Sequence, residues 1–154
     1  MNIALNEAKK AYNINETPIG AVIVKNDIII ARAYNKRETS NLATSHAEVL
    51  AINKACKKLK SWRLDDCEMY ITLEPCMMCL GAIIQSRIKK IYIDAKEPKN
   101  GCICSVMDIK NINTTHKIQY EFIENDNKSE KLLKMFFKEL RVNKKIEKNI
   151  KNKK

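Results

Sequence analysis

Glycine and proline are scarce in this chain, which has 3 residues of each among 154. A collagen-like repeat and a proline-rich linker are therefore excluded, since both need far more of these residues. Long apolar runs are missing as well. Runs such as residues 21–24 and 28–31 have the length of strands, whereas a membrane span takes roughly 18–20 apolar residues. We therefore expect no membrane-spanning segment and no membrane partner.

The N-terminus also lacks the pattern of a secretory signal, because no basic segment is followed there by an apolar stretch of about 7–15 residues. We expect a cytoplasmic protein. The six cysteines would then be reduced thiols, since disulfides are rare in that compartment. Cysteines in this setting serve as core residues, metal ligands or nucleophiles.

Positive charge dominates the chain, with 29 Lys and Arg against 18 Asp and Glu and a net charge of +11. This balance indicates an anionic partner, nucleic acid before a membrane surface. The length suits one domain, which we place at residues 1–142, followed by a basic tail at residues 143–154. The tail would either bind RNA phosphates or be a solvated helix end that frays, because its apolar residues are sparse.

Hydrophobic patterning predicts an alternation of helices and strands. Apolar residues recur at helical spacing in four segments, residues 3–12, 46–58, 75–86 and from about 128 onward. Apolar and β-branched runs predict five strands, at residues 19–24, 28–33, 69–73, 88–93 and 118–123. We expect a polar loop at 35–45 and an irregular segment at 96–117, with one helical turn near Val106 and Met107. This order favours an α/β protein with three layers and a mixed central sheet.

Two motifs lie where helices are predicted to begin. They read His46-Ala47-Glu48 and Pro75-Cys76-Met77-Met78-Cys79. Cys76 and Cys79 are three residues apart, so both sulfurs lie on one side of the first helical turn. Pro75 suits the first helical position, because its missing N–H needs no partner there. A helix N-terminus favours the negative charge of two thiolates, and zinc prefers thiolate and imidazole ligands.

The small number of histidines limits the ligand set. Only His46 and His116 occur, and His116 has no thiol or acidic neighbour at ligand-like spacing. His46 and the two cysteines make three ligands, whereas a structural zinc site closes with four and a catalytic one leaves a position for water. Two thiolates cancel the charge of the ion, which makes the ion a weaker acid towards its bound water. Such a site therefore benefits from a nearby base. Glu48 is the candidate, if the helix turns its N-terminal end to the pocket.

Each part has another explanation when taken alone. Ser45 and Glu48 match a capping box, a histidine at a helix start is often a surface residue, and a Cys-x-x-Cys pair is also typical of core or redox sites. The conjunction is more specific than its parts. His-x-Glu followed by Pro-Cys-x-x-Cys is the signature of zinc-dependent deaminases.

With these residues in view, the chain resembles the bacterial tRNA-specific adenosine deaminase family, which forms inosine at the wobble position. The similarity runs from about residue 3 to about residue 142 and includes residues 16–22, 34–35, 70–83, 86–88, 101, 105–108 and 136–137. The resemblance implies the three-layer α/β/α fold of the cytidine deaminase-like superfamily. It also implies a homodimer with one zinc ion per subunit and the tRNA anticodon stem-loop as partner.

The resemblance assigns roles to the motif residues. His46, Cys76 and Cys79 would bind zinc, while Glu48 would move protons as water attacks C6 of adenine.

The resemblance also implies a set of substrate residues. Asn35 would hydrogen-bond the flipped base, and Ile19 and Leu73 would form apolar walls of its pocket. Residues 95–101 match a loop that contacts anticodon nucleotides. The family usually has an Asp where Glu97 stands, so the carboxylate of this chain is one methylene longer.

Two other functions stay open. One is a deaminase of guanine, cytidine or another free base or nucleoside, and the other is a zinc-stabilised RNA-binding module without activity. The basic charge balance and the Asn35 and loop residues favour tRNA over small substrates. The three-ligand count and Glu48 argue against an inactive module.

Overall fold

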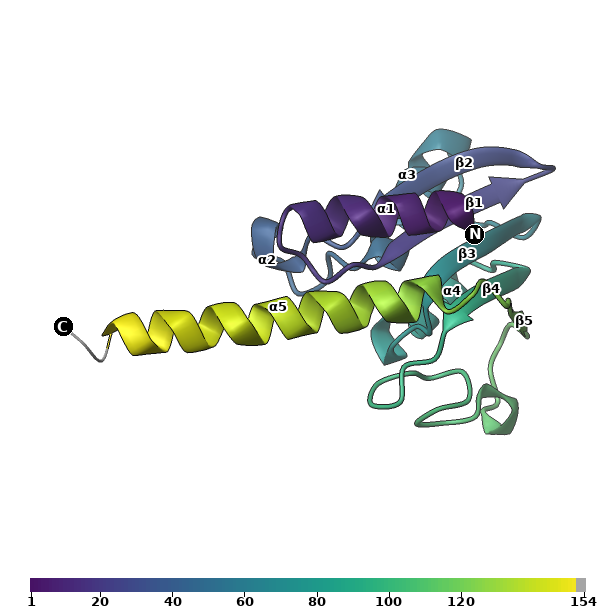
Figure 1. The fold of residues 1–154 in the computed structure, drawn as a ribbon. Coiled ribbons are helices and arrows are strands. Elements are labelled where there is room, and N and C mark those ends of the chain that lie inside the picture. Colours follow the sequence, from purple (N-terminus) through teal and green to yellow (C-terminus); the bar gives the residue numbers. More distant parts are fainter. Residues whose placement is uncertain (152–154) are drawn as a thin grey trace.

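The computed structural model describes residues 1–151 and shows a five-stranded sheet covered by helices on both faces (Figure 1). Along the chain, the elements are α1 (Asn2–Asn13), β1 (Gly20–Lys25), β2 (Ile28–Tyr34), α2 (Arg37–Ser40), α3 (Ala47–Leu59), β3 (Cys67–Leu73), α4 (Met77–Gln85), β4 (Lys90–Ala95), the 3₁₀ turn η1 (Ile109–Asn111), β5 (Gln119–Phe122) and α5 (Lys128–Lys151).

The sheet is mixed, as predicted. Its strand order is β2-β1-β3-β4-β5, with β1 antiparallel to β2 and β3 and with β3, β4 and β5 parallel to one another. Leu73 at the end of β3 pairs with Ala95 at the end of β4. The turn into α4 and the segment after β4 therefore leave the sheet at the same edge.

The helices complete the three layers of an α/β/α sandwich, which confirms the predicted fold class. α1 and α5 lie side by side on one face of the sheet, and α3 and α4 pack together on the other (Figure 1). Because alternate residues of a strand point to opposite faces, one set of apolar side chains forms the core under α3 and α4. Its fully buried strand members are Ala21, Ile23, Met69, Ile71, Ile91 and Ile93.

A glycine brings α1 unusually close to the sheet. A Cβ at Gly20 would lie 2.0 Å from the carbonyl oxygen of Ala4 and 2.6 Å from the nitrogen of Ala8. Any other residue at this position would force helix and strand apart. The short residues of α1, Ala4, Ala8 and Ala11, are accordingly fully buried.

The last helix, α5, continues far beyond the rest of the molecule (Figure 1). Its first half packs through Phe136, which is buried, and through Leu132, Leu133 and Leu140, which are half-buried. Phe137, in contrast, is 41% exposed. Every residue from 141 to 151 is exposed, yet this stretch is helical rather than frayed. The tail residues 152–154 lie outside the described residues.

Three local expectations were wrong. Residues 35–45 are not all loop, because α2 forms within them. Pro75 does not open a helix: α4 begins at Met77, and Cys76 is its extended N-cap with φ −72° and ψ 172°. The helical turn expected near Val106 and Met107 lies at η1 instead, because the Asp108 carboxylate caps that turn by accepting a hydrogen bond from the N–H of Lys110 (2.9 Å).

Within residues 1–151, none of the helices has both the length and the apolar character needed to cross a bilayer.

Candidate active site

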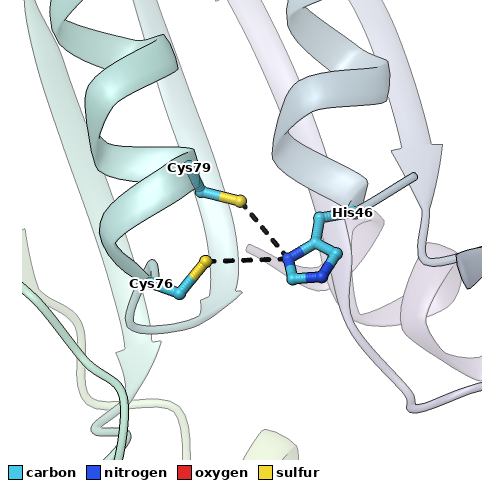
Figure 2. Close-up of side chains that lie close together, drawn as sticks. All are labelled: His46, Cys76 and Cys79. Atoms are coloured by element: carbon cyan, nitrogen blue, oxygen red, sulfur yellow. Dashed lines mark hydrogen bonds between the residues drawn. The ribbon is translucent and has the colours of Figure 1, made fainter. Parts of the chain in front are cut away.

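The starts of α3 and α4 lie next to each other, and the side chains of their N-cap residues point toward one another (Figure 2). His46 is the N-cap of α3 and Cys76 the N-cap of α4. Nδ1 of His46 lies 3.7 Å from Sγ of Cys76 and 3.5 Å from Sγ of Cys79. The three predicted ligands therefore lie together, although they come from segments about thirty residues apart.

Local backbone geometry explains why the side chains converge. Both N-caps are extended, with ψ values of 150° at His46 and 172° at Cys76, so each side chain leaves its helix at the end rather than along the side. Neither residue caps its own helix through its side chain. Cys79, one turn into α4, points to the same side as Cys76 (Figure 2).

The electrostatics of the three predicted ligands favour the binding of a cation. Hydrogen bonds from Cys79 and His46 lower the pKa of Cys76 to about 4. The same hydrogen bond with Cys76, together with burial, raises the pKa of Cys79. The hydrogen bond with Cys76 also raises the pKa of His46. Without a metal, Cys76 is therefore a thiolate stabilised by its two neighbours, and a divalent cation would take the place of the shared protons.

Glu48 lies in the second position of α3 and is 3% exposed. Burial raises the pKa of its carboxyl group. Its Oε2 atom is buried and has no hydrogen-bond partner among residues 1–151. The capping-box alternative does not apply, because His46 rather than Ser45 is the N-cap and the Ser45 hydroxyl accepts a hydrogen bond from Ser40 (2.9 Å).

The residues present fit a catalytic metal better than a structural one. One nitrogen and two sulfur atoms lie within 4.8 Å of one another, and no fourth His, Cys, Asp or Glu joins this group in the described part of the chain. His116 is used elsewhere, since its Nε2 lies 2.7 Å from the carbonyl oxygen of Ile88. The unpartnered Oε2 of Glu48 is the polar atom that a water molecule in the fourth position would satisfy.

Two of the predicted substrate residues, Asn35 and Ile19, are neighbours. The backbone N–H of Asn35 donates to the carbonyl of Ile19 (3.0 Å). The buried Asn35 side chain donates from Nδ2 to Oε2 of Glu16 (2.9 Å). Because a carboxylate only accepts, this bond sets the orientation of the amide and turns Oδ1 away from Glu16. Neither Asn35 nor Ile19 is hydrogen-bonded to the three ligands in residues 1–151.

Leu73 and Glu97 line a second region, a groove of about 1000 Å³ between the ends of β4 and β5 and the side of α5. Phe122, Phe137 and Arg141 also line it. Oε1 of Glu97 accepts a hydrogen bond from the N–H of Lys99 (2.9 Å). The longer carboxylate of this chain thus folds back onto its own loop.

Glu74 is a buried carboxylate that sequence reasoning missed, although it stands directly between Leu73 and the Pro75 motif. It is 2% exposed and accepts hydrogen bonds from residue 97 and from residues 103–105. Burial alone would raise its pKa, but these hydrogen bonds outweigh burial and lower the pKa below the usual value of 4.5. A charged residue between a buried strand and a helix was the available signal, since buried carboxylates are rare without partners.

Comparison with known proteins agrees with this site. A family model described as MafB19-like deaminase matches residues 1–141. A tRNA-specific adenosine deaminase of Aquifex aeolicus is 44% identical over 144 residues, which cover 93% of this chain and 95% of that protein.

Solved structures give the same result. One, from a study of A-to-I editing by tRNA:A34 deaminases at the wobble position of transfer RNA, has a TM-score of 0.83 and 36% identity, and the match covers 86% of this chain and 97% of that chain. A guanine deaminase from Bacillus subtilis has a TM-score of 0.61 and 37% identity, with 82% and 84% of the two chains covered. The resemblance seen in the sequence is confirmed: the chain belongs to the MafB19-like deaminases and, among them, to the family of the tRNA-specific adenosine deaminases.

Proposed function

We propose that this chain is a zinc-dependent hydrolase that deaminates adenosine to inosine at the wobble position of tRNA. One observation carries the proposal: the buried carboxyl group of Glu48 interacts with the charges of Cys76 and His46 in the open group of three metal-ligand atoms, and its Oε2 has no hydrogen-bond partner within residues 1–151. A metal site that only stabilised the fold would have a fourth protein ligand and no need for Glu48.

His46, Cys76 and Cys79 hold the zinc ion. When bound, zinc supplies Lewis-acid activation of a water molecule at neutral pH. Glu48 accepts the two protons of water in turn and delivers one to N1 of adenine and the other to the departing amino group, so that ammonia leaves as oxygen is added at C6. The raised pKa of Glu48 supports this role, because a proton carrier works best with a pKa near the working pH.

The residues that hold the base are those that the resemblance to the family implies. Asn35 offers Oδ1 and one N–H to the edge of the flipped base, with Ile19 and Leu73 as the apolar walls. Residues 95–101, including Glu97, contact the neighbouring nucleotides along the groove beside Leu73.

The charge distribution supports RNA rather than a free base as substrate. Between residues 138 and 151 of α5, Lys and Arg number six against two Glu, and the helix is exposed from residue 141. We assign residues 1–142 to the deaminase domain and residues 143–154 to a basic arm that binds tRNA phosphates. The enzyme acts in the cytoplasm as a homodimer with one zinc ion per subunit.

A guanine deaminase is the second candidate, because a solved guanine deaminase shares 37% of its residues with this chain. Incubation of the zinc-loaded protein with three substrates separates the functions: an anticodon stem-loop carrying adenosine at the wobble position, free guanine, and cytidine. We expect inosine in the digested stem-loop and no turnover of the other two. Turnover of guanine alone supports the second candidate, and zinc binding without any turnover supports an inactive RNA-binding module.

A further inference from the structure

We propose that Glu74 is a positioning residue, whose carboxylate holds residues 97–105 in the conformation that receives the RNA and ties this segment to the turn that carries Cys76. The inference rests on the proposed RNA substrate. Within residues 1–151, Glu74 makes no hydrogen bond to the metal ligands and does not line the groove, so its effect on the reaction passes through the segment that it binds.

The hydrogen bonds converge on one side chain from both ends of the segment. Oε1 of Glu74 accepts from the backbone N–H groups of Ile103 (2.9 Å), Cys104 (2.8 Å) and Ser105 (3.1 Å). Oε2 accepts from the N–H of Glu97 (3.1 Å) and from the hydroxyl of Ser105. Three consecutive N–H groups aimed at one oxygen form an anion-binding nest, filled here by the protein's own carboxylate.

Close approach of the backbone shows that the segment is shaped around this carboxylate. A Cβ at Gly101 would lie 2.5 Å from Oε2 of Glu74 and 2.6 Å from the backbone carbonyl oxygen of Glu97. Only glycine allows the chain to pass so near, which gives Gly101 a steric role in the same arrangement.

The segment has two sides with different tasks. Its inner side is made of backbone N–H groups that point to Glu74, whereas Glu97, Lys99 and Asn100 line the groove on its outer side. The N–H of Cys102 also donates to the carbonyl of Pro75 (2.9 Å), the residue before Cys76. Contacts at Glu74 and Pro75 therefore fix the position of the outer surface relative to the metal-binding turn.

Glu74→Gln is the sharpest test, because it keeps the size of the side chain but turns an NH₂ donor towards N–H donors. We expect the amides of residues 103–105 to exchange with deuterium at least about tenfold faster, and the KM for the stem-loop to rise about tenfold or more. Zinc content should stay at one ion per chain and kcat within about threefold of wild type. Glu121→Gln is the matched control, since Glu121 lies on β5, is not among the residues that line the groove, and pairs with Lys90.

Unchanged amide exchange or an unchanged KM in Glu74→Gln would overturn the inference. If this variant does not fold, Ser105→Ala decides, because it removes one donor only: a KM rise of about threefold supports the inference and a wild-type KM overturns it. The exchange measurement needs no substrate. Absence of inosine formation by the wild-type protein would thus refute the proposed function, while the exchange rates would still show whether Glu74 holds the segment.

Discussion

Replacing Glu48 by glutamine perturbs one proton-carrying oxygen and little else. The side chain is 3% exposed and Oε2 has no partner within residues 1–151, so the exchange breaks no hydrogen bond at that atom. The three ligand atoms are unchanged, and zinc should bind as in wild type. Turnover should fall by about 10²–10⁴-fold, which is the usual contribution of a positioned general acid–base group.

The same variant should be more stable towards unfolding than wild type when both are metal-free. Burial raises the pKa of Glu48 above its ordinary value of 4.5, so the folded chain binds this proton more tightly than the unfolded chain does. Stability therefore falls as pH rises from about 4.5 to the raised folded pKa, and glutamine is free of this loss. Each tenfold gain in proton affinity corresponds to about 1.4 kcal/mol. Metal-free Glu48→Gln protein should melt at a higher temperature than metal-free wild type at pH 7, with little difference below about pH 4.

Three measurements check this reasoning: zinc per chain by elemental analysis, inosine formation in single-turnover reactions, and melting curves at several pH values after chelation. Glu121→Gln serves as the control for loss of a carboxylate at an exposed site. Turnover within tenfold of wild type at full zinc occupancy would refute the role of Glu48. A lower melting temperature of the variant at pH 7 would refute the account of its burial.

Other predictions concern the ligands, the substrate and the arm. Cys76→Ser should reduce zinc affinity by at least about 100-fold, measured by competition with a chelating dye, and full occupancy would contradict the ligand assignment. Binding of tRNA, followed by fluorescence anisotropy, should weaken by about 50-fold between about 50 and 200 mM salt if about four phosphates are contacted; a flat salt dependence would favour a small substrate. Deletion of the residues after Val142 should lower tRNA affinity by about tenfold or more and leave zinc content unchanged, whereas equal affinity would show that this end of α5 is merely solvated.

Much of the fold follows from local sequence patterns. The five strands and the four long helices lie where apolar spacing predicts them, because each must bury one face. Two of the three local errors come from hydrogen bonds that apolar spacing does not reveal. α2, for example, is anchored by Glu16, whose Oε1 accepts from the N–H of Thr39 (2.6 Å) 23 residues later in the chain.

The candidate site, like the fold, could be predicted only in part. Two short motifs single out His46, Glu48, Cys76 and Cys79 in the sequence, and in the structure the side chains of the three predicted ligands lie together. Their roles, and those of Asn35, Ile19, Leu73 and Glu97, stay predictions.

The carboxylates Glu16 and Glu74 were missed because their hydrogen-bond partners are distant in the sequence. Glu16 and Glu74 act on partners that lie between 19 and 31 residues away in the chain, and only folding brings those partners within reach.

The pairing of two helix starts has a consequence for folding. His46 and Cys76 are separated by 30 positions, and neither caps its own helix. A metal ion held between them acts as a cross-link that closes a loop of this length. Such a cross-link lowers the entropy of the unfolded chain and so stabilises the folded state by about 3.5 kcal/mol, which is comparable to the contribution of a disulfide. Chelation should therefore loosen the first turns of α3 and α4 together. The reaction centre would thus also link these two parts of the fold.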